Sequence, residues 1–201
     1  MITLVQRHLE AIYDVEAPDV RDFLVPAEAL GELIGERRTS REWVLVRQEE
    51  DGVDIGVYIH ADDIAAVDGL SPVRAVLDAM PAWAAVTEGV SHFLLLARRA
   101  VREEPVSLLE LEAQAEVDKF VTARLHIGSD PMLRRRLFHN ATLADGLDGE
   151  ETMRYREAGR LADRYCERLE KCRDVGALLE ELRVFYRMSG VARMERLRRV
   201  A

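Results

Sequence analysis

A glutamate and a histidine four residues apart lie in a segment that is apolar on nearly all sides. Glu88 and His92 belong to the stretch 82–102, which has an apolar side at helical spacing and carries Leu95 and Leu96 on the opposite side. A helix of this composition is buried on more than one face. Residues four apart in a helix are neighbours, so both side chains are expected in or near the interior. A buried carboxylate has to be paired, protonated or bound to a metal.

A second predicted helix supplies further ionisable groups. Glu116 lies near the edge of its apolar side, with Glu112 four residues before it and Lys119 three residues after it. Pro105 breaks the chain between the two helices, and helices joined by so short a connection usually pack antiparallel. An antiparallel helix pair over 82–126 would bring Glu116 close to the glutamate and histidine of the first helix.

One imidazole and two carboxylates form a set that can bind a divalent ion. The sequence predicts Glu88, His92 and Glu116 as ligands of zinc, manganese or iron, with coordination positions left open for substrate. Glu112 and Lys119 would then assist proton transfer in a small hydrolase. Lys119 is one of two lysines among 28 basic residues, and its compact ammonium differs chemically from the guanidinium used elsewhere.

Other interpretations of the same residues stay open. The E-x-x-x-H spacing is neither the H-E-x-x-H of zincins nor the E-x-x-H of di-iron bundles. Glu88 and His92 could form a hydrogen-bonded pair with Arg99 or with backbone, and Glu116 could pair with Lys119 or with an arginine. Acid/base chemistry without a metal is a third possibility.

Two further side chains have a weaker claim to chemistry. Ser91 precedes His92, but no G-x-S-x-G elbow surrounds it, and adjacent helical residues point about 100° apart. His60 precedes Asp62 and Asp63 and is as well explained as a helix N-cap.

The absence of a recognised catalytic motif favours a first hypothesis without catalysis. In it, the chain is a partner-binding or self-associating helical protein that forms homo-oligomers through a hairpin edge or its C-terminal helices. The metal-dependent enzyme is the alternative hypothesis.

Composition limits the partners and the compartment. The net charge is −9, and the 16 basic residues from Pro131 onward are interleaved with 12 acidic ones, so a nucleic-acid partner is not expected. No apolar run reaches the roughly 18 residues of a membrane span, and no secretory signal begins the chain. Cys166 and Cys172 lack a C-x-x-C spacing. These features predict a cytoplasmic protein that does not bind membranes.

The elements that must position the candidate residues are mainly helical. The expected fold class is mainly α (α+β), a bundle-like single domain over 1–201 with a small N-terminal β-hairpin. Residues 43–46 and 53–59 are rich in β-branched residues, and Asp51-Gly52 between them is a hairpin-turn signal. The portion 1–70 mixes helix and hairpin, and 71–201 is helical.

Several helices are marked by apolar spacing or by an N-terminal signal. The predicted segments are 3–13, a short helix from Asp19, 27–34, one beginning at Ser71-Pro72, the pair over 82–126, one opened by Asp130-Pro131, 150–172, one capped by Asp174, and a short piece after Ser189-Gly190.

Overall fold

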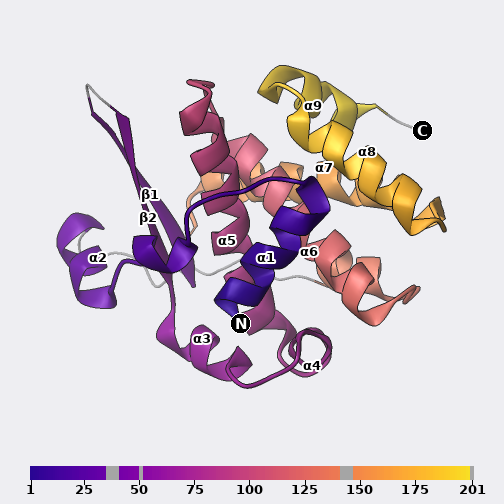
Figure 1. The fold of residues 1–201 in the computed structure, drawn as a ribbon, viewed down its shortest axis with the longest axis horizontal. Coiled ribbons are helices and arrows are strands. Elements are labelled where there is room, and N and C mark those ends of the chain that lie inside the picture. Colours follow the sequence, from indigo (N-terminus) through magenta and orange to yellow (C-terminus); the bar gives the residue numbers. More distant parts are fainter. Residues whose placement is uncertain (35–40, 50–51, 141–146, 200–201) are drawn as a thin grey trace.

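The computed structural model describes residues 1–34, 41–49, 52–140 and 147–199 (Figure 1). In chain order the elements are α1 (Ile2–Tyr13), η1 (Val20–Phe23), α2 (Ala27–Ile34), β1 (Glu42–Glu49), β2 (Gly52–Ile59), α3 (Ala61–Val67), α4 (Pro72–Asp78), α5 (Met80–Val101), α6 (Leu108–Ile127), η2 (Arg135–His139), α7 (Gly149–Lys171), α8 (Val175–Arg187) and α9 (Gly190–Arg198). The mainly helical fold with a two-stranded antiparallel hairpin is the predicted fold class, which is confirmed.

Most helix starts follow from capping side chains. Ser71, Ser107, Asp174 and Ser189 each accept a hydrogen bond from the backbone N–H three residues on, as N-caps do. The helix expected after Asp130-Pro131 is only the π-helical turn η2. Helix α3 begins at the N-cap that the sequence offered as one explanation of His60. Asp51 of the predicted hairpin turn lies outside the described residues.

Helix α5 is the centre of the fold. Trp83, Val86, Val90 and Phe93 on it are fully buried, and Leu95 on its other side is fully buried too. The hairpin, α1, α3, α4 and α6 all pack against it. The expectation that this helix is covered on more than one face is therefore confirmed.

The hairpin lies directly on α5 because a glycine faces it. A Cβ atom at Gly89 would lie 3.1 Å from Cγ1 of Ile59 and 3.3 Å from Cγ1 of Val57, both on β2. Glu42 of β1 is paired with Ile59 in the strand register. The close approach therefore brings the first residue of β1 to the segment of α5 that carries Glu88 and His92.

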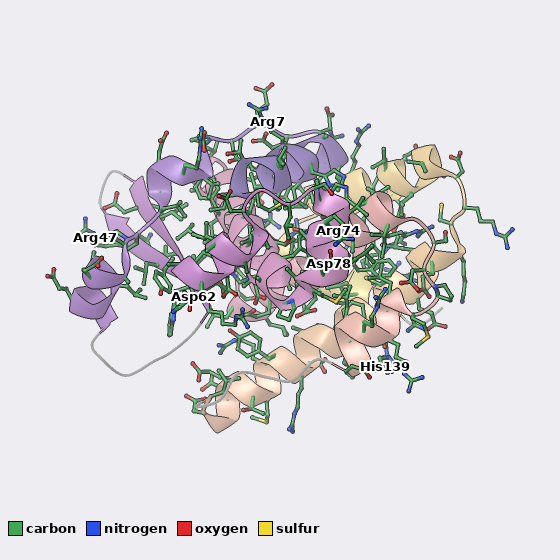
Figure 2. The ribbon with its side chains drawn as sticks, turned by 90° about the horizontal axis from the view of Figure 1, so that it is seen from below. Arg7, Arg47, Asp62, Arg74, Asp78 and His139 are labelled. Atoms are coloured by element: carbon green, nitrogen blue, oxygen red, sulfur yellow. The ribbon has the colours of Figure 1, made fainter. Side chains whose placement is uncertain are left out.

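Helix α6 is covered on two sides. Figure 2 shows α1, which carries Arg7, along the upper edge of the view and α7 along the lower edge, with α5 and α6 between them. His139 of η2 lies beside α7 and contacts Asp163 of that helix at 3.1 Å. The ionisable residues of α6 are therefore enclosed and not exposed on an outer face.

A polar network occupies one side of α6. The Asp118 carboxylate accepts hydrogen bonds from Ser91 Oγ at 2.6 Å, from Gln114 Nε2 at 2.8 Å and from the Tyr13 hydroxyl. Gln114 accepts in turn from the buried guanidinium of Arg193 at 3.2 Å. This network fastens α1, α5 and α9 to α6.

Within the described residues, no helix is both long enough and apolar enough to cross a membrane.

Replacing Gly89 tests the close packing of the hairpin. We expect Gly89→Ala to lower the free energy of unfolding by roughly 1 kcal/mol, since overpacking against β2 outweighs the gain in helix propensity. Gly159→Ala in α7 is the matched control, because its Cβ would meet no atom within 4 Å. The control should raise the free energy of unfolding by up to about 1 kcal/mol. Denaturant unfolding measures both, and equal gains in the two variants would contradict the packing.

Candidate metal centre

Three side chains from α5 and α6 bring possible metal ligands together. Glu88, His92 and Glu112 each offer one donor atom, and these three atoms all lie within 4.8 Å of one another. His92 and Glu112 are buried, and the Glu88 side chain is 17% exposed, so one edge of the cluster reaches solvent. A ring nitrogen with two carboxylates is a ligand set used by zinc, manganese and iron.

The two ring nitrogens of His92 face different carboxylates. Nδ1 lies 3.5 Å from Oε2 of Glu42, and Nε2 lies 3.7 Å from Oε2 of Glu112. The His92 side chain is only 5% exposed, yet no described residue forms a hydrogen bond with Nε2. Buried polar atoms are nearly always hydrogen-bonded. An unpaired Nε2 beside two carboxylates is an arrangement that a metal ion would complete.

The two glutamates of α6 have different partners. Oε1 of Glu116 lies 2.7 Å from Nζ of Lys119, three residues on, and the same ammonium donates to Glu88 at 3.1 Å. Glu112 has no basic residue at these helical spacings. The structure thus brings Glu112, predicted as an assisting residue, to His92, while Glu116, predicted as a ligand, is paired with Lys119.

Two local alternatives from the sequence can be compared with the geometry. Arg99 pairs with Glu104 and, at 2.8 Å, with Glu110, so it is not the partner of Glu88 or His92. The pairing of Glu116 with Lys119 is present.

The two residues with weaker claims have structural roles. Ser91 donates its hydroxyl to Asp118 on the side of α5 turned to the polar network. His60 caps α3, because its Nδ1 accepts a hydrogen bond from the backbone N–H of Asp62 at 3.2 Å.

The cluster alters the proton affinity of its members. Burial alone would lower the pKa of His92, but the carboxylates of Glu42, Glu112 and Glu88 raise it to about 9. Burial raises the pKa of Glu112 to about 7, although the nearby imidazole opposes the shift. Without metal, His92 is therefore protonated at neutral pH, and a metal ion would have to displace that proton.

Burial and neighbouring charges also shift the pKa values of the remaining ionisable groups of the cluster. Burial alone would raise the pKa of Glu88, but Lys119 and His92 keep it below its usual range. Burial raises the pKa of Glu42 and of Glu116. Burial alone would lower the pKa of Lys119, and the carboxylates of Glu116 and Glu88 raise it well above its usual range. Lys119 therefore stays an ammonium at neutral pH.

The cluster has the charge that a divalent ion would balance. With a neutral imidazole, four carboxylates and two cations leave two negative charges. The groups counted are Glu42, Glu88, Glu112 and Glu116 on one side and Lys119 and Arg154 on the other.

The geometry is close to that of a bound ion. Donors around one tetrahedral ion at bond lengths of about 2.0–2.2 Å lie about 3.3–3.6 Å apart. Nε2 of His92 and Oε2 of Glu112 lie 3.7 Å apart, which is close to this separation. The three possible ligand atoms lie within 4.8 Å of one another, so binding an ion would draw them together by up to about 1 Å. Glu42 on Nδ1 would hold the ring with Nε2 turned to the ion, as carboxylates behind metal-bound histidines do.

Two residues of the site have no signal in the sequence. Glu42 begins β1, and Arg154 of α7 lies with its Nε 3.9 Å from Oε1 of Glu112. Both come from elements far along the chain from the helix pair, so no spacing relates them to His92. Only the packing of β1 and α7 against the pair reveals them.

Comparison of the chain with protein-family models, with curated proteins and with solved structures found no significant match.

The raised pKa of His92 predicts how the stability of the protein depends on pH when a chelator has removed any metal. The folded protein holds the His92 proton up to about pH 9, whereas the unfolded chain loses it near 6.5. This stabilisation is complete below pH 6.5 and is lost as the pH rises through 9. We expect the free energy of unfolding to fall by roughly 2–3 kcal/mol between these values.

His92→Gln is the control for this pH dependence, because it keeps a polar side chain but does not titrate. Denaturant unfolding of both proteins with chelator, at a series of pH values, isolates the contribution of the imidazole. If the two proteins lose stability in parallel from pH 6.5 to 9.5, the imidazole is not held protonated by these carboxylates.

Proposed function

We propose that this protein is a metal-dependent hydrolase that binds one divalent zinc, manganese or iron ion through Glu88, His92 and Glu112. The observation that carries the proposal is the buried Nε2 of His92, which has no hydrogen bond to a described residue and lies 3.7 Å from Glu112, in a group whose three possible ligand atoms lie within 4.8 Å of one another. Nothing else among the described residues supplies that nitrogen with a partner. A metal ion satisfies it and balances the excess negative charge.

Three protein ligands leave coordination positions for water and substrate. A divalent ion held by these residues would lower the pKa of a water ligand toward neutrality and would so supply a hydroxide nucleophile. Lys119, held by Glu88 and Glu116, contributes a fixed positive charge beside the reacting group. The partly exposed edge at Glu88 is the entry we assign to substrate.

The proposed compartment is the cytoplasm. Cys166 and Cys172 are both free thiols, which agrees with a reducing environment.

Metal binding tests the assignment of ligands. We expect protein purified without chelator to bind one equivalent of divalent ion and to release protons as it binds. His92→Gln and Glu112→Gln should each weaken binding by on the order of 100-fold or more, because each removes a ligand. Glu116→Gln is the matched control, since Glu116 is paired with Lys119, and it should retain binding within about ten-fold. Calorimetry and elemental analysis give these values.

Hydrolysis of p-nitrophenyl phosphate and p-nitrophenyl acetate then tests the chemistry. Activity that requires zinc or manganese and is lost in Glu112→Gln supports a hydrolase. A protein that binds no metal and keeps its fold in these variants contradicts the proposed function.

Self-association is the second candidate function, and the hairpin favours it. Val46 pairs near the tip with Ile55 and shares its face with Val57, which is fully buried against α5. Toward the tip the same face is open: Val46 is 52% and Val53 is 40% exposed. An apolar strand face that extends past its covering helix suits a second copy of the chain.

Light scattering across concentration tests this candidate. We expect wild-type protein to form a dimer that the double variant Val46→Thr/Val53→Thr weakens by roughly ten-fold or more in dissociation constant. Val191→Thr is the control, because Val191 is 74% exposed on α9. A monomer at all concentrations would leave no role for the hairpin face in assembly.

A further inference from the structure

The guanidinium of Arg154 is mostly buried and makes no hydrogen bond. Its side chain is 17% exposed, and its Nε is fully shielded from solvent without an acceptor. Its contacts with described residues are an ion pair of 3.9 Å with Glu112 and a position over the Tyr155 ring, with Cζ 5.5 Å from the ring centre. A buried N–H group normally has an acceptor, so Nε of Arg154 lacks the acceptor that it requires among the described residues.

The position of Arg154 beside the candidate metal centre suggests what its missing acceptor is. Glu112, the one ion-pair partner of Arg154 among the described residues, is one of the three residues that bring metal ligands together. Arg154 therefore approaches the candidate metal from α7, through its contact with Glu112. Tyr155 lies beside it, and its phenol is close enough to Glu112, Glu88 and Glu42 for those carboxylates to raise its pKa further than burial alone. The phenol thus stays protonated and is a hydrogen-bond donor.

We propose that Arg154, with the metal ion, binds an oxyanion, so that the substrate or product of this protein carries a phosphate or a carboxylate group. A guanidinium presents two parallel N–H donors that match two oxygens of such a group, and this pairing is stronger than a neutral hydrogen bond. One oxygen on the ion and another on Arg154 would also fix the reacting group in orientation. The proposal rests on the proposed metal site.

Alternatives within the protein do not account for Arg154. If it served only to neutralise Glu112, a direct hydrogen bond would be expected, yet the separation is 3.9 Å. Arg134, the residue before η2, shows how an arginine usually pairs with carboxylates in this protein. It contacts Asp163 of α7 at 2.7 Å and Glu170 of α7 at 3.1 Å. Arg154 instead makes no hydrogen bond to a described residue, although it lies beside a carboxylate cluster whose ammonium, Lys119, pairs with Glu88 and Glu116 and not with Glu112.

Binding of inorganic phosphate and of acetate to the full chain tests the proposal. The protein is loaded with Mn²⁺, and the anion is titrated while water-proton relaxation and calorimetry are recorded. We expect the anion to displace metal-bound water, which lowers the relaxation enhancement. Arg154→Met should weaken anion binding by roughly 10- to 100-fold. The anion affinity of Arg154→Lys should lie between those of wild type and Arg154→Met, because lysine keeps the charge but loses the paired donors.

Arg156→Met is the matched control, because Arg156 is exposed on the same helix and its loss changes the net charge equally. It should leave anion affinity unchanged. A preference for phosphate over acetate assigns the substrate to phosphoryl compounds, and the reverse assigns it to carboxylates.

The outcomes separate this inference from the metal site. Metal binding with anion affinity that is equal in wild type and Arg154→Met overturns the role of Arg154 and leaves the metal site intact. Anion binding that depends on Arg154 in a protein without metal affinity supports the oxyanion site and overturns the metal-dependent hydrolase. Loss of metal affinity in Arg154→Met, with anion binding to the residual loaded protein unchanged, makes Arg154 a structural partner of Glu112 and overturns the inference.

Discussion

The structure depends on how charge is balanced inside the α5–α6 interface. Carboxylates that leave water need cations or hydrogen-bond donors in compensation, because an isolated buried charge is very costly. Lys119 compensates two of them, Glu88 and Glu116, with one ammonium. His92 stands between two more, Glu42 and Glu112, and can compensate them only while it is protonated. The interface is therefore stable with a proton on the imidazole or with a metal ion in its place, and these two states compete.

The hairpin and α7 enclose this interface from either side. Gly89 lets β2 lie against α5, and the strand pairing then carries Glu42 to the imidazole. Helix α7 closes the other side and contributes Arg154. Neither the hairpin nor α7 would be stable in these positions alone, since a two-stranded hairpin is marginal in water and an isolated helix gains little without packing. The elements that complete the cluster are thus also held by packing against its two helices.

The sequence predicted most of the fold because its signals are local. Capping side chains, glycine and proline breaks and apolar spacing mark where helices begin and which face is buried. The composition of the site was harder to predict from the sequence. A helical wheel places Glu112 and Glu116 on one face, but the choice between them depends on Lys119, which holds Glu116. Glu42 and Arg154 arrive through tertiary packing, and no pattern in the sequence relates them to the helix pair.

Two buried polar clusters on α6 show by contrast what is unusual about the metal centre. Around Asp118, three side chains donate to one carboxylate, so its charge is met by hydrogen bonds. Nε of Arg193 in that network also lacks a hydrogen bond among the described residues, but the carboxylate itself is satisfied. In the cluster on the other side the atoms without a hydrogen bond are Nε2 of His92, Oε2 of Glu42 and Nε of Arg154, so the imidazole and a carboxylate themselves are unsatisfied. Both clusters belong to one helix in one core, so poor packing of α6 does not explain the difference. A cluster that packs closely and still leaves an imidazole nitrogen and a guanidinium unpaired beside carboxylates is best completed by a cation together with an anion.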